Sequence, residues 1–83
     1  MKKSVMSVEA MVDMYLTYGV EEETWEMLYR MANHGLISRE NWTKFYETCK
    51  GWAVSEDGNS IVDTDTGKTL YEYNEIGDLV KVA

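Results

Sequence analysis

Hydrophobic residues recur at helical spacing in three segments of the first 50 residues. In each segment they fall at i, i+3, i+4 and i+7, which places them on one face of an α-helix. The pattern therefore predicts three short helices, each with one apolar stripe. The stripes are Val8, Met11, Val12, Tyr15 and Leu16; then Trp25, Leu28, Tyr29 and Ala32; then Trp42, Phe45, Tyr46 and Cys49.

Residues that favour helix ends stand at the borders of these stripes. Ser7 and Ser38 are placed to cap the first and third helices, and the acidic run 21–23 suits the positive end of the second helix. A glycine follows each stripe and predicts where each helix stops. These glycines are Gly19, Gly35 and Gly51.

The second and third segments resemble two copies of one unit. Residues 23–29 align with residues 40–46 at an offset of 17, and the alignment matches Trp25 with Trp42 and Tyr29 with Tyr46. The similarity is better explained by two helices that each pack their first turn through a tryptophan than by a duplication of the sequence. In either case we expect both Trp–Tyr pairs in the core, with the two tryptophans mostly buried.

After Gly51 the pattern changes to short strands separated by turns that are rich in Asp, Gly and Asn. We expect strands at 52–55, 60–63, 69–73 and 79–82, with turns at 56–59, 64–67 and 74–78. The chain is thus predicted to be a single α+β domain over 1–83, with a helical half at about 7–50 and a three- to four-stranded antiparallel meander at about 52–82 in one core. The sheet face expected to pack on the helices comprises Trp52, Val54, Tyr71, Tyr73, Val80 and Val82.

Charge narrows the choice of partners. Among 83 residues, 15 acids oppose 8 bases, and residues 51–83 carry −5 of the net charge of −7. An acidic surface repels phosphate, so we expect neither nucleic acid nor membrane as a direct partner. One cysteine cannot form an internal disulfide, and no apolar run reaches the ~18 residues of a membrane span. We expect a cytoplasmic protein.

Few residues could support catalysis or bind a metal. His34 and Cys49 are the only residues of their types, so a structural zinc site within one chain is excluded, and Cys49 lies on an apolar stripe. The run 63–67 has the composition of a calcium loop, but its glycine is fifth and Asn74 stands at the twelfth position, where an EF-hand requires Glu. We therefore expect no enzyme activity, cofactor or metal.

Three helices followed by a hairpin is also the element order of a winged helix, a DNA-binding fold. Helix 39–50 is only weakly basic, and the wing tip would present Glu56 and Asp57 to phosphate. A winged-helix regulator therefore stays a second alternative.

Three stretches, Tyr15 to Gly19, Glu22 to Trp25 and Gly35 to Trp42, form a pattern in which a glycine, then Ile-Ser, then an acid and an aromatic residue open the next helix. In this pattern, residues 15–50 resemble short XkdX-type phage proteins. The resemblance implies an origin in a phage or another mobile element. The β half is an addition to that family's pattern.

Together these observations predict a small acidic protein-binding module of phage type in a bacterial host. It would inhibit a nucleic-acid-handling or defence factor by occupying a basic surface, as anti-CRISPR proteins do. A phage structural or tail accessory protein is the alternative. The candidate partner-binding residues are the acids of the turns, which lie at the surface and can steer association. They are Glu56, Asp57, Asp63, Asp65, Glu75 and Asp78.

Overall fold

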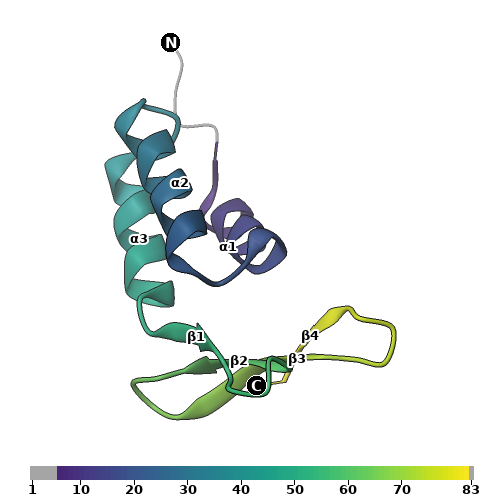
Figure 1. Ribbon diagram of the computed structural model, residues 1–83. Helices are drawn as coiled ribbons and strands as arrows, with labels where there is room; N and C mark the ends of the chain where they lie inside the picture. The colour runs from purple at the N-terminus through teal and green to yellow at the C-terminus, as the bar shows by residue number, and fades with distance from the viewer. Residues whose placement is uncertain (1–5, 83) are drawn as a thin grey trace. The chain divides into compact units, whose positions relative to one another are not determined.

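The computed structural model describes residues 6–82 and shows three helices followed by a four-stranded antiparallel sheet (Figure 1). The strand order is β1-β2-β3-β4, so each strand pairs with its neighbour in sequence. The predicted α+β fold class, with N-terminal helices and a β-meander, is confirmed. The elements are α1 (Val8–Tyr18), α2 (Glu22–Asn33), α3 (Arg39–Cys49), β1 (Trp52–Val54), β2 (Ser60–Asp63), β3 (Lys68–Tyr73) and β4 (Leu79–Lys81).

Contacts along the chain divide it into two units. The helical unit ends at Lys50 and the β unit begins at Gly51. The single core expected for both halves stays a prediction. No helix within residues 6–82 has the length and apolar content of a membrane span.

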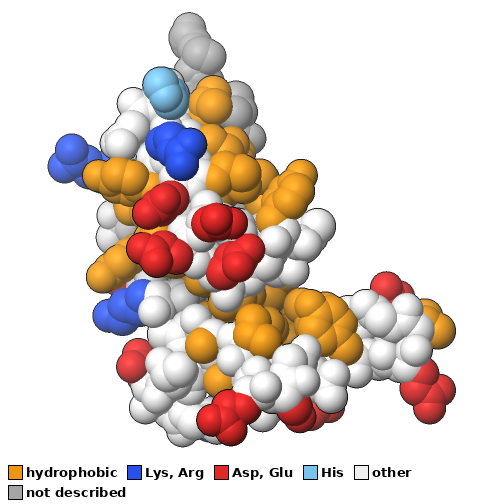
Figure 2. All heavy atoms as spheres, in the orientation of Figure 1, with side chains coloured by type: hydrophobic (Ala, Val, Ile, Leu, Met, Phe, Trp, Pro, Cys, Tyr) orange, Lys and Arg blue, Asp and Glu red, His pale blue; other side chains and the backbone are white. Residues whose placement is uncertain are grey.

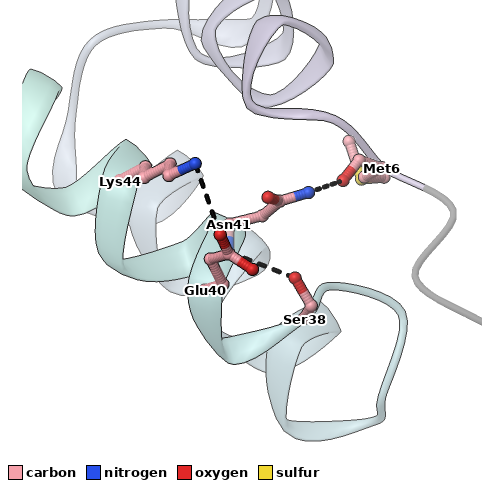
Figure 3. A network of polar contacts seen from close by, with 5 residues as sticks. All are labelled: Met6, Ser38, Glu40, Asn41 and Lys44. Atoms are coloured by element: carbon pink, nitrogen blue, oxygen red, sulfur yellow. Dashed lines mark hydrogen bonds and ion pairs between the residues drawn. The ribbon is translucent and has the colours of Figure 1, made fainter.

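The helix ends form as their residues predict. The Ser7 hydroxyl accepts a hydrogen bond from the Ala10 amide (3.0 Å), and the Ser38 hydroxyl accepts one from the Asn41 amide (3.1 Å; Figure 3). These caps satisfy amides that have no partner within the helix. After α2, Gly35 adopts a φ of 83°, which lets the Leu36 amide donate to the Met31 carbonyl at 3.0 Å and closes the helix.

The core of the helical unit draws on all three helices. Met11 of α1, Leu28 of α2 and Phe45 of α3 are fully buried, and the ring of Tyr15 makes an edge contact with that of Phe45 at 5.7 Å. Figure 3 shows that the Asn41 side chain also donates to the Met6 carbonyl at 3.0 Å, which ties α3 to the segment before α1. The helical unit is therefore held by apolar packing with one polar tie.

The tyrosines of the two repeated pairs lie outside the core, contrary to the prediction. Tyr29 is 51% exposed and Tyr46 is 46% exposed, whereas Trp25 and Trp42 are only partly accessible. Each tyrosine follows its tryptophan by four residues, at the outer edge of the seam between α2 and α3, where its hydroxyl can reach water. The expectation of mostly buried tryptophans is confirmed, and that of buried tyrosines is wrong.

The sheet register corrects the predicted apolar face. Tyr71 pairs with Lys81 and Tyr73 pairs with Leu79, whereas Val80 pairs with Glu72. Paired residues project to the same face, so Leu79 joins the tyrosines, and Val80 projects to the opposite face together with Val82, two residues on. A register shift beside Ile61 changes the pairing within the β2–β3 ladder. Trp52 and Tyr71 share a face as predicted, and their ring centroids are 5.7 Å apart, whereas Val54 and Tyr73 are 47% and 45% exposed.

Candidate functional site: an acidic groove in the β unit

The turn between β1 and β2 is built around the carboxylate of Asp57. Its Oδ1 accepts a hydrogen bond from the Ser55 hydroxyl at 2.6 Å and another from the Asn59 amide at 3.0 Å. The Ser55 hydroxyl in turn accepts from the Ser60 amide at 3.1 Å. These hydrogen bonds, the one from Ser55 foremost, lower the pKa of Asp57 from its ordinary value of 3.8. Asp57 is therefore a fixed negative charge.

The turn between β3 and β4 is held by Asn74 in a similar way. Its side-chain oxygen accepts from the Ile76 amide at 3.1 Å and from the Asp78 amide at 2.9 Å. The Asn74 amide also donates to the Asp78 carbonyl at 2.8 Å. Because the backbone is fixed by the asparagine, the carboxylate of Glu75 is free to project from the turn, and Glu75 is exposed.

These two turns lie at the same end of the meander. Successive turns of an antiparallel meander alternate between the two ends of a sheet, so the first and third turns meet. The Tyr73 amide donates to the Asn59 carbonyl at 3.0 Å and joins the end of β3 to the first turn. The second turn, between β2 and β3, lies at the other end (Figure 1).

A shallow hollow of about 430 Å³ opens where the two turns meet. Its lining includes three carboxylates, two carboxamides and a hydroxyl, together with Tyr73, whose side chain projects to the face of β3 opposite to that of Glu72. Its lining residues are Asp57, Asn59, Ser60, Glu72, Tyr73, Asn74 and Glu75.

A second hollow of about 330 Å³ shares two residues with the first, Asp57 and Ser60, and adds the carboxylate of Glu56. We call the two hollows together the acidic groove. Neither lining contains a lysine or an arginine, although the β unit has Lys68 and Lys81. The acidic groove thus presents four carboxylates that no base within its lining neutralises.

The structure gathers only some of the predicted site residues. Glu56, Asp57 and Glu75 line the acidic groove, whereas Asp63, Asp65 and Asp78 do not. Glu72 also lines the acidic groove and was not predicted, because it lies within a strand rather than in a turn. Its place between two tyrosines in an alternating strand was the signal that could have identified it.

Asp63 and Asp65 lie at the opposite end of the sheet, Asp63 at the end of β2 and Asp65 in the turn between β2 and β3. Asp63 Oδ1 accepts from the Asp65 amide at 2.9 Å, and the Thr64 amide and hydroxyl both donate to the Gly51 carbonyl, at 2.7 Å and 2.9 Å. A Cβ at Gly51 would lie 2.9 Å from an Asp65 carboxylate oxygen and 3.0 Å from one of Asp63. A Cβ at Gly51 would therefore require the Asp65 carboxylate to move.

The one cysteine and the one histidine of the chain, Cys49 and His34, both belong to the helical unit. Within residues 6–82, no group of three or more His, Cys, Asp or Glu side chains is arranged to hold a metal ion. Cys49 is fully buried, and this burial raises the pKa of its thiol from 9.0 to about 12, so the nucleophilic thiolate is suppressed. His34 is exposed at the end of α2. The acidic groove offers carboxylate acceptors suited to a cationic group.

Comparison of the chain with protein-family models, with curated proteins and with solved structures finds no match. The function therefore has to be argued from the residues themselves.

Proposed function

We propose that this chain is a small, non-enzymatic protein-binding module whose acidic groove occupies a basic surface on a partner protein. The observation that supports the proposal is the lining of the acidic groove, where four carboxylates meet without a lysine or arginine. Like charges gathered in one concavity raise the local negative potential, which favours the approach of a cation. The partner therefore presents Lys or Arg side chains.

The shape and remaining lining of the acidic groove suit a basic side chain better than a small anion or an apolar group. Carboxylates at Glu72 and Glu75 accept hydrogen bonds from ammonium or guanidinium groups, and Asp57 stays ionised because its turn holds the charged form. The same carboxylates repel the phosphates of nucleic acid.

The biological setting proposed is inhibition of a host nucleic-acid-handling or defence factor in the bacterial cytoplasm. Proteins that handle nucleic acids carry basic grooves, and an acidic module can block such a groove by competing for its lysines and arginines. The phage-type origin rests on the resemblance of residues 15–50 to XkdX-type proteins, and the inhibitory role rests on the charge of the β unit.

Capture of the partner followed by binding kinetics tests this function. The tagged chain is used to isolate its partner from a bacterial lysate, and association is measured with the purified partner at about 0.05 M and about 0.3 M salt. We expect the on-rate to fall steeply over this range because salt shortens the reach of the charges. The variant Glu56→Lys, Glu72→Lys, Glu75→Lys is expected to lower the on-rate about tenfold or more. Asp57 is left unchanged because it holds its turn.

The matched control makes the same change of charge on the helical unit. Asp13, Glu23 and Glu47 are exposed, and their joint replacement by lysine alters the net charge equally. We expect this control to change the on-rate much less. Equal effects of the two triple variants, or capture of an acidic partner, would contradict the proposed role of the acidic groove.

A further inference from the structure

Four aromatic side chains form a continuous row across α2 and α3. Ring centroids lie 5.7 Å apart between Tyr46 and Trp25, 5.5 Å between Trp25 and Trp42, and 5.7 Å between Trp42 and Tyr29. We call these residues the aromatic row. Its two ends are the tyrosines, each about half exposed. The row therefore continues from the core to the surface of the helical unit.

The aromatic row is symmetric in its contacts. Each tryptophan contacts the other tryptophan and the tyrosine of the opposite helix. Exchanging α2 for α3 therefore reproduces the same set of contacts, which is the structural counterpart of the repeat at an offset of 17 residues. In an isologous two-fold interface both copies contribute the same surface patch, and the aromatic row could be that patch.

Charges beside the aromatic row differ in sign between the two helices. On α2, Glu22 and Glu26 precede Trp25 and Tyr29 by three residues each, so they are their neighbours on the helix surface. On α3, Lys50 follows Tyr46 by four residues, and its Nζ lies 5.9 Å from the centre of that ring. Figure 2 shows acidic side chains gathered over the first half of α2.

The two helices run antiparallel, because Trp25 near the start of α2 contacts Tyr46 near the end of α3. Glu22 and Glu26 are thus level with Lys50 along the helix pair. A two-fold axis parallel to the helices would place α2 of one copy on α3 of the other. The acids of one copy would then face Lys50 of its partner, twice in the complex.

We propose that the aromatic row is the interface of a weak homodimer, in which two copies pack row to row about such an axis. The exposed area sets its strength. An aromatic side chain of 150–250 Å² that is half exposed offers about 100 Å², so the two tyrosines together offer about 200 Å² and the less accessible tryptophans add less. The aromatic row therefore falls well below the ~800 Å² that each partner buries in a stable interface. We expect a dissociation constant on the order of 100 μM.

Sedimentation equilibrium of the full chain from about 10 μM to about 1 mM tests the dimer. The weight-average mass should rise from 9.6 kDa toward twice that value. A chain that stays monomeric at 1 mM would overturn the proposal.

A charge exchange between two variants tests the orientation of the dimer. The variant Lys50→Glu and the double variant Glu22→Lys, Glu26→Lys should each dimerise at least about threefold more weakly, and their equimolar mixture should recover association at least as strong as wild type. A purely structural role for these exposed charges would not give this recovery. Asp13→Lys, at an exposed position of α1, is the control and should leave the dimer unchanged. A mixture no stronger than its components would contradict the proposed packing.

Discussion

Trp25 is the residue on which the helical unit depends most, because its ring contacts four others. It lies 5.1 Å from Phe45, 5.5 Å from Trp42, 5.6 Å from Tyr15 and 5.7 Å from Tyr46, measured between ring centroids. We predict that Trp25→Ala strongly destabilises the helical unit. These ring contacts join all three helices through the one side chain of Trp25.

The expected magnitude follows from the area that the indole buries. A tryptophan side chain that is mostly inaccessible removes about 170 Å² from water, which at ~25 cal/mol/Å² corresponds to about 4 kcal/mol. Substitutions of buried tryptophan by alanine cost ~3–5 kcal/mol, in agreement with this figure. In a domain of this size the loss corresponds to a decrease in Tm of more than ~12 °C.

Thermal and urea unfolding followed by far-UV circular dichroism at about 10 μM measures the effect, at a concentration where the monomer predominates. Tyr18→Ala is the control, since Tyr18 is 64% exposed at the end of α1, and we expect it to change stability by less than ~0.5 kcal/mol. If Trp25→Ala lowered Tm no more than Tyr18→Ala, the aromatic row would not be part of the core.

Three further predictions concern single sites. Because burial raises the pKa of the Cys49 thiol to about 12, a thiol reagent at pH 8 should modify Cys49 at least about a hundredfold more slowly in the folded chain than in the denatured chain. The contribution of the protonated thiol to stability is full below pH 9.0 and is lost as pH rises toward 12. The pKa of Asp57, followed by NMR, should lie below 3.8 and return toward that value in the variant Ser55→Ala. The contribution of the Asp57 carboxylate to stability is present above pH 3.8 and is lost as pH falls through the lowered pKa. Gly51→Ala should destabilise the β unit by about 1 kcal/mol in urea unfolding, because its Cβ would displace the Asp65 carboxylate.

The helices and strands could be predicted because their signals are local. Capping serines, terminal glycines and the period of the apolar stripes all lie within the segment that they define, as the hydrogen bond to Ser38 shows. The faces of the last strand could not be predicted in this way. Leu79 and Lys81 alternate with Val80 and Val82, so both faces of β4 offer an apolar residue, and only the pairing with β3 decides between them.

The candidate site was predicted only in part because its residues meet through topology. Local sequence gives every acid in a turn the same weight, yet the meander brings the first and third turns together and sends the second to the far end of the sheet. Asp63 and Asp65 therefore carry the same local signal as the acids of the groove, whereas Glu72 lies within a strand, where the local pattern indicates packing. The rule that turns alternate between sheet ends would have separated these acids from the sequence alone.

The central proposal is that the acidic groove binds basic side chains. Its most direct test is backbone NMR of the chain with an arginine-rich peptide of about ten residues. Titration of the isotope-labelled full chain at 0.15 M salt, with an equally long neutral peptide as control, is expected to shift the amides of residues 57, 59, 60 and 72–75, which line the larger hollow. The shifts should disappear in the variant Glu56→Lys, Glu72→Lys, Glu75→Lys and persist in the variant Asp13→Lys, Glu23→Lys, Glu47→Lys. Shifts spread evenly over the acidic residues of both units, or confined to α2, would contradict the acidic groove as the binding site.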